Sequence, residues 1–140
     1  MKKQTLFLLL FGVIISFCFQ RQIASDKNQT VNAILGDISF IEKFRCQPDL
    51  STNENLRITT HLEYVEKLLR HKKVTNLSPE LRQRRNHLLD LLRDYREAGI
   101  FPRNYDYKES RKPCFIDKEN RICAVGYLIE KTAGRRIAED

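Results

Sequence analysis

Apolar residues recur at intervals of three and four along three stretches of the chain, the spacing of one face of a helix. These stretches span residues 31–44, 56–71 and 79–98. Gly36 lies inside the first stretch and lowers its helix propensity. The pattern predicts three helices, of which the second and third form an antiparallel hairpin, since only a short connection around residues 74–77 separates them.

The second and third stretches also carry signals for their ends. Ser51 and Glu54 have the spacing of a capping box ahead of the second. Ser78 is a favourable N-cap before Pro79, and Gly99 suits the left-handed position after the third helix. The residues expected to form the apolar line of the second helix are Ile58, Leu62, Val65, Leu68 and Leu69. The residues expected to form the buried stripe of the third are Leu81, Leu88, Leu91, Leu92 and Tyr95.

The pattern changes after residue 100. Residues 101–112 are polar, aromatic and irregular, which is typical of a loop. Two short apolar runs at 114–116 and 121–123 then flank four polar residues, which predicts a small β-hairpin with Asn120 in a left-handed conformation. Residues 124–133 are mostly apolar and predict a short buried helix that ends at Gly134.

Gly126 lies within this last helix, where it would allow a close approach of another backbone or side chain. The expected fold class is therefore mainly α. We expect a small helical domain, made of a helical hairpin and further helices, with one short β-hairpin near the C-terminus.

The N-terminus reads as a secretory signal peptide, residues 1–18. Lys2 and Lys3 precede an uncharged apolar run of about 13 residues, which is too short to span a membrane. Cleavage after Cys18 would leave a polar, disordered lead-in at 19–30 and a single helical domain at 31–140. The protein is then exported, either periplasmic or secreted, and not transmembrane. A lipid-bearing Cys18 is the alternative, although Phe17 before it is unusual for a lipoprotein signal.

The formal net charge is +7, and Lys2 and Lys3 would leave with the signal. The remaining excess of five lies in the middle of the chain, since residues 57–96 hold ten basic and five acidic residues. A basic face can bind nucleic acid, anionic lipid or acidic polysaccharide. Export makes nucleic acid an unexpected partner. The side chains predicted for an anionic surface are Arg82, Arg85, Lys72 and Lys73. The alternative is an ordinary solvated helix surface.

Three cysteines remain after signal removal: Cys46, Cys114 and Cys123. A four-residue hairpin loop would place Cys114 opposite Cys123 and permit a disulfide. A three-residue loop with Asn120 left-handed would place Cys123 opposite Phe115 instead, and the pattern does not choose between them. Cys114 and Cys123 are also the candidate nucleophiles of a thiol-dependent or hydrolytic enzyme, because basic residues precede both.

Other chemistry has weaker support in the sequence. Arg103, Tyr105 and Tyr107 form a candidate binding loop, unless the loop folds back over the core. Asp117 and Glu119 are close in sequence, but acids are ordinary in a turn. The three histidines and three cysteines lack the close pairs of a zinc site, although His61 and His87 could approach each other across the hairpin. No metal and no cofactor is expected.

The stretches LRITTHLEYVEKLLR, YREAGIFPRNYDY and RKPCFIDKENRICAVGYLIEKTAGR resemble a family of uncharacterised exported bacterial proteins. The resemblance covers about the last 85 residues, and CAVGYLIE is its most specific part. The family usually has Gly near the turn where this chain has Glu119 and Asn120. The resemblance implies a shared fold and export but transfers no activity. The leading hypothesis is a non-enzymatic binding or envelope-associated protein whose partner is an envelope protein or an anionic surface.

Overall fold

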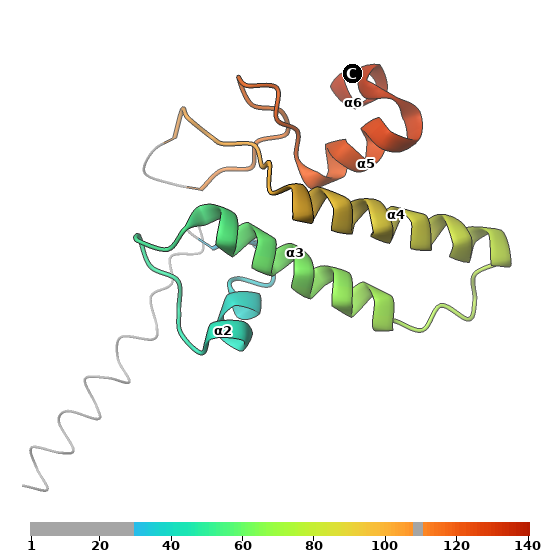
Figure 1. Ribbon diagram of the computed structural model, residues 1–140, viewed down its shortest axis with the longest axis horizontal. Helices are drawn as coiled ribbons and strands as arrows, with labels where there is room; N and C mark the ends of the chain where they lie inside the picture. The colour runs from blue at the N-terminus through green and yellow to red at the C-terminus, as the bar shows by residue number, and fades with distance from the viewer. Residues whose placement is uncertain (1–29, 108–110) are drawn as a thin grey trace, which may run out of the picture.

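The computed structural model describes residues 30–107 and 111–140, and these ranges contain five helices. The helices are α2 (Ile38–Phe44), α3 (Glu54–His71), α4 (Pro79–Ala98), α5 (Ala124–Ala133) and α6 (Arg135–Glu139). The antiparallel hairpin of α3 and α4 forms the centre (Figure 1). Helix α2 packs on α3, α5 packs on α4, and α6 packs on α5. The predicted signal peptide, with Cys18, lies outside the described residues.

Helix α4 begins and ends as the sequence predicts. The Ser78 side chain accepts a hydrogen bond from the Leu81 backbone N–H, and Pro79 occupies the first helical position. Gly99 follows the helix with a φ of +66°, in the left-handed region. A residue with a side chain would be strained there, so the glycine stops the helix and sends the chain back across the hairpin.

Helix α3 is also present, but the predicted capping box at Ser51 and Glu54 is wrong. The N-cap is Asn53, whose side chain accepts a hydrogen bond of 3.0 Å from the Leu56 N–H. Ser51 donates instead to the Asp49 carboxylate. Asn and Ser cap helices about equally well, so the local turn around Asp49 decides which of them does so here.

Helix α2 is shorter than its apolar pattern predicts, because residues 31–37 form turns. Gly36 has a φ of +58°, which is incompatible with a continuous helix. The Asn32 side chain accepts hydrogen bonds from the backbone N–H groups of Ile34 and Leu35, which fixes a tight turn before the helix. The chain therefore reaches α3 with only two turns of helix.

The apolar core lies between the second half of α4, α5 and the segment between them. Its centre is Tyr95, whose ring contacts Phe101 and Tyr127 at centroid distances of 5.4 and 5.2 Å. The Tyr95 hydroxyl donates a buried hydrogen bond of 2.9 Å to the Ile122 carbonyl. The buried apolar residues are Phe40, Leu89, Leu92, Tyr95, Phe101, Ile122 and Ala138.

The predicted β-hairpin is not formed. Residues 114–123 reverse direction, but only Ile116 and Ile122 form a bridge, which stands alone. Pro113 has no N–H to extend a ladder, and on the other side the chain enters α5 directly after Cys123. Asn120 has the predicted left-handed conformation, with a φ of +61°. The segment, called the 114–123 turn below, is thus a tight reversal without strands.

The close approach predicted at Gly126 is confirmed. A Cβ atom at this position would lie 2.4 Å from Ile122 Cγ1 and 2.9 Å from Phe115 Cζ. Only a glycine lets the first turn of α5 pack directly on the 114–123 turn. In this way α5 and the turn form one packed unit against α4.

None of the helices in the ranges 30–107 and 111–140 is long and apolar enough to cross a membrane.

Candidate functional site

The apolar stripe of α4 is buried near its C-terminal end and exposed near its start. Leu92 and Tyr95 are 7% and 5% exposed, whereas Leu88 and Leu81 are 37% and 48% exposed. The sequence predicted Leu81 and Leu88 to be buried, which is wrong. The other elements cover only the second half of α4 (Figure 1), so the stripe continues into solvent.

The end of α3 completes this exposed apolar region. Leu68 and Leu69, which end the apolar line predicted for this helix, are 50% and 37% exposed. Arg85 lies on the same face of α4 as Leu81, four residues before it, and Leu88, three residues after it, because residues three or four apart share one face of a helix. Its guanidinium donates to the Leu69 carbonyl. This hydrogen bond ties the start of α4 to the end of α3, and the four partly exposed leucines all lie at this end of the hairpin.

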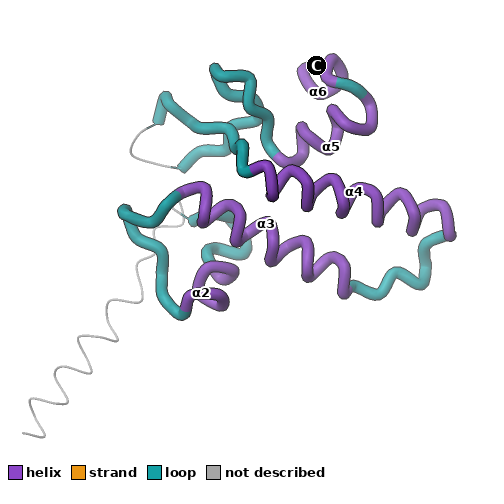
Figure 2. Tube along the Cα trace, viewed as in Figure 1, coloured by secondary structure: helices purple, strands orange, loops and turns teal. Residues whose placement is uncertain are grey.

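We call residues 68–88 the hairpin tip: the end of α3, the connection that follows it and the first half of α4. In the tube of Figure 2 the connection is the long loop that joins these two helices. The tip holds six Lys or Arg residues and a single acid, Glu80. Four of the cations are exposed and form no ion pair within the described part of the chain; they are Lys72, Lys73, Arg82 and Arg84.

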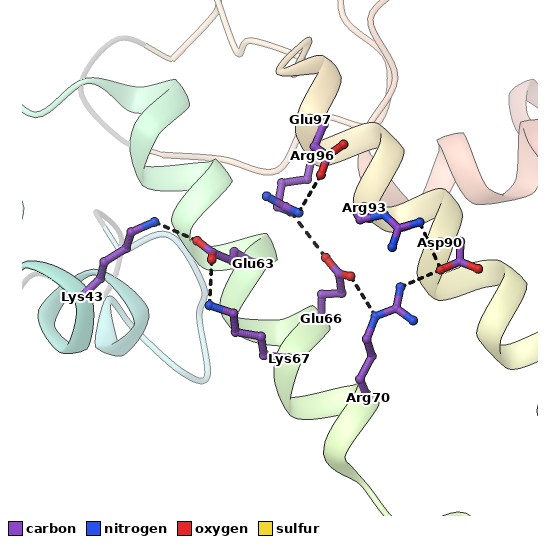
Figure 3. A network of polar contacts seen from close by, with 9 residues as sticks. All are labelled: Lys43, Glu63, Glu66, Lys67, Arg70, Asp90, Arg93, Arg96 and Glu97. Atoms are coloured by element: carbon purple, nitrogen blue, oxygen red, sulfur yellow. Dashed lines mark hydrogen bonds and ion pairs between the residues drawn. The ribbon is translucent and has the colours of Figure 1, made fainter.

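Four acids that lie outside the tip, Glu63, Glu66, Asp90 and Glu97, pair with cations in a network on α3 and α4 (Figure 3). Buried Glu66 binds Arg70 at 2.8 Å and Arg96 at 3.4 Å, which joins α3 to α4. Asp90 accepts from Arg70 at 2.9 Å and lies 3.3 Å from Arg93. Charge is neutralised in this half of the hairpin and remains positive at the tip.

Glu63 extends this network towards α2. Its carboxylate binds Lys43 at 2.8 Å and Lys67 at 2.7 Å. Hydrogen bonds from these two ammonium groups, Lys43 first, lower the pKa of Glu63 to about 2. The carboxylate is therefore ionised throughout the neutral range and does not serve as a proton donor or base there.

The predicted binding loop is mainly folded into the structure. Phe101 is buried, and the Tyr105 hydroxyl donates to Glu119 and accepts from Arg121, both at 2.6 Å. Tyr107 is 51% exposed, and the ammonium of Lys112 lies 3.4 Å from its ring centroid. The side chain of Arg103 is exposed.

Asp117 holds this loop to the 114–123 turn. Its buried carboxylate accepts from the backbone N–H groups of Arg103, Glu119 and Arg121, and from the Arg121 guanidinium at 2.7 Å. Burial alone would raise the pKa of Asp117, but these donors outweigh it and lower the pKa to about 2. The pair Asp117 and Glu119 is thus a structural clamp around Arg121, since both acids bind that side chain.

Cys114 and Cys123 are free thiols, as is Cys46, so the possible disulfide is not formed. The bridge between Ile116 and Ile122 sets Cys123 opposite Phe115, as expected for the three-residue alternative. Cys123 Sγ accepts from the Gly126 N–H at 3.5 Å and caps α5.

The surroundings of Cys114 do not favour a nucleophilic thiolate. Burial raises the pKa of its thiol, and the negative charges of Asp117 and Asp106 raise it further. A reactive thiol needs the opposite influence, from a cation or a base. The basic residues that precede Cys114 in sequence do not outweigh the acids that lie near it in space.

The histidines are separated by the fold. His61 is 8% exposed and packs near α2, whereas His87 is exposed on α4. Burial lowers the pKa of His61; the charge of Asp37 opposes this, and that of Arg111 adds to it. Within the described ranges, no group of three or more His, Cys, Asp or Glu residues is arranged to hold a metal ion.

A buried ion pair that the sequence analysis missed fastens α2 to α3. Asp37 is 5% exposed and binds the Arg57 Nε at 2.7 Å. Two partners separated by twenty residues leave no local signal in the sequence.

Three further polar atoms at buried positions have no hydrogen-bond partner among the described residues: Ser39 Oγ, Thr60 Oγ1 and His61 Nδ1. Helix α3 therefore buries the polar residues Thr60, His61 and Glu66, whereas Leu68 and Leu69 of its predicted apolar line are partly exposed.

Three comparisons with known proteins found no match. No family model matches the chain, and neither a curated protein nor a solved structure matches it.

Proposed function

We propose that this protein is an exported, non-enzymatic binding protein that uses the hairpin tip to attach to a negatively charged surface of the cell envelope. The separation of charge along the hairpin carries the proposal. Cations nearer the middle of the hairpin bind acids of the same chain. Among residues 30–107 and 111–140, by contrast, four cations of the tip form no ion pair and share the tip with a single acid, Glu80; they are Lys72, Lys73, Arg82 and Arg84. Such an uncompensated group attracts anions over a distance set by salt screening.

The enzyme alternative has less support. Its candidate nucleophile Cys114 has a raised pKa, and Cys123 caps a helix. Asp117 is fully engaged by the backbone and by Arg121. The residues that would perform chemistry are thus used to hold the turn in place.

The test compares two triple variants with the same net charge. One removes the tip charges through Lys72→Gln, Lys73→Gln and Arg82→Gln. The matched control removes exposed charges elsewhere through Arg45→Gln, Lys131→Gln and Arg136→Gln. The same preparation is used for every variant, so any contribution of residues 1–29 is common to all.

Binding is measured on vesicles of phosphatidylglycerol and phosphatidylcholine, and on a polyuronate gel, over a series of salt concentrations. We expect the unmodified chain to bind at low salt and to be released as salt rises. The tip variant should bind anionic vesicles roughly a hundredfold more weakly, since each cation near such a surface contributes about a factor of five. The proposal is wrong if the two triple variants bind equally, or if the unmodified chain binds neither probe.

A further inference from the structure

The tip carries both exposed leucines and cations that form no ion pair among the described residues. Together these two features indicate which kind of anionic surface the tip can bind. Leu68, Leu69, Leu81 and Leu88 are all at least 37% exposed. Among the described residues, no further element covers this end of the hairpin, because α2 packs on α3, and α5 on α4, away from the connection (Figure 1). Four partly exposed leucines at the same end of the hairpin concentrate apolar surface there.

We infer that the anionic surface is a lipid bilayer, into whose interface the tip inserts its leucines while its cations contact lipid phosphates. This inference rests on the proposed function and adds to it the chemical class of the partner. The occupant must offer both negative charge and an apolar phase within a few ångströms. An anionic bilayer offers both, because its phosphates lie directly above its acyl chains.

The geometry of the cations supports this choice. Arg82 follows Leu81 directly in α4, and Lys72 and Lys73 follow within five residues of Leu68. Long basic side chains keep their charge at the headgroups while their methylene stems lie along apolar surface. Arg85, between Leu81 and Leu88, is held to the Leu69 carbonyl and ties the two helices together at this end.

An acidic polysaccharide would satisfy only the cations. Its carboxylates pair with Lys and Arg, but its hydroxylated chain offers no apolar phase, so the leucines would remain in water. If the partner is a polysaccharide, removal of the charges should abolish binding and removal of the leucines should leave it unchanged. If the tip inserts into a bilayer, either removal should weaken binding.

The first experiment removes the leucines. The double variant Leu68→Ser, Leu81→Ser is compared with Ile34→Ser, Leu50→Ser, which changes two residues that are 93% and 103% exposed. On phosphatidylglycerol vesicles we expect the tip variant to bind about tenfold more weakly and the control to bind like the unmodified chain. Both should keep the unmodified helical circular dichroism, which separates lost insertion from lost folding.

The second experiment places a reporter at the tip. The chain has no tryptophan, so Leu81→Trp supplies the sole indole, and Leu50→Trp is the matched control in the loop before α3. On addition of anionic vesicles, the emission of Leu81→Trp should shift to the blue and be quenched by brominated acyl chains, whereas that of Leu50→Trp should not.

The outcomes separate this inference from the proposed function. Vesicle binding that depends on the tip cations, without a shift for Leu81→Trp, would overturn insertion and leave the anionic surface in place. Retention on the polyuronate gel without vesicle binding would overturn the bilayer and keep the proposed function. Binding to neither probe would overturn both and would point to a protein partner for the exposed leucines.

Discussion

At the residue scale, replacing Gly126 by alanine would change the stability of the fold in two opposing ways, through helix propensity and through packing. In an open helix position, replacing Gly by Ala stabilises by about 1 kcal/mol. Here the added Cβ would lie 2.4 Å from a side-chain atom of buried Ile122 and 2.9 Å from Phe115. Overpacking of that kind costs about 1–3 kcal/mol, and Ile122, which is 6% exposed, has little room to move. The clash should therefore outweigh the gain in propensity.

We expect Gly126→Ala to lower the free energy of unfolding by about 2 kcal/mol, measured by urea denaturation. Val125→Ala is the control, since Val125 lies in the same helix and is 62% exposed, and its change should stay within about 0.5 kcal/mol. An Ala variant at least as stable as the unmodified chain would show that the turn does not pack on α5 as described.

Single residues also show how far sequence reasoning reaches. Ser78, Gly99 and Gly126 were assigned correctly because each acts through the few residues around it. Leu81 was assigned incorrectly because its burial depends on whether another element covers the tip. A helical period identifies the apolar face but not what packs against it.

At the scale of elements, the 114–123 turn depends on one carboxylate in place of a ladder of strand pairs. Asp117 accepts three backbone N–H groups and the Arg121 guanidinium, and its side chain is 1% exposed. Asp117→Asn would keep one acceptor oxygen but lose the charge and leave donors without a partner. A buried donor without a partner costs about 1–3 kcal/mol.

We therefore expect Asp117→Asn to destabilise the protein by about 3 kcal/mol in thermal and urea unfolding. Asp106→Asn removes an exposed acid of the neighbouring loop and should have little effect. Equal effects of the two substitutions would contradict the role of Asp117 as a clamp.

The same turn explains why the predicted β-hairpin was wrong. Two short apolar runs around a polar tetrapeptide suit a hairpin, and Asn120 does take the expected left-handed conformation. The strands fail to form because Cys123 already caps α5, which ends the second run after one bridged residue. Competition between adjoining elements is not visible in the pattern of either run alone.

At the scale of the whole molecule, polar contacts hold α2 to the rest. The helix contributes one buried apolar residue, Phe40. It is fastened to α3 by the pair of Asp37 and Arg57, and by Lys43 with Glu63. His61 is buried in the same region, and burial lowers its pKa, so the folded chain protonates it only at a lower pH than an exposed histidine. The attachment of α2 therefore brings a pH dependence to the stability of the fold.

The sign of this dependence follows from proton uptake. The unfolded chain protonates His61 near pH 6.5, whereas the folded chain does so only at lower pH, so the unfolded state binds more protons between these values. Stability should therefore fall as pH drops from about 6.5, by up to about 1.4 kcal/mol per pH unit. Glu63 and Asp117 have pKa values of about 2 in the folded protein, so their stabilisation is lost only in stronger acid.

We expect His61→Gln to flatten the unfolding free energy between pH 6.5 and 5, measured in urea at half-unit steps. A glutamine keeps hydrogen-bonding capacity but takes up no proton there, so the slope reports titration even if the variant is less stable overall. His87→Gln, at an exposed position on α4, should keep the slope of the unmodified chain. If His61→Gln retains the full slope while His87→Gln loses it, the acid sensitivity arises at the hairpin surface and not where α2 meets α3.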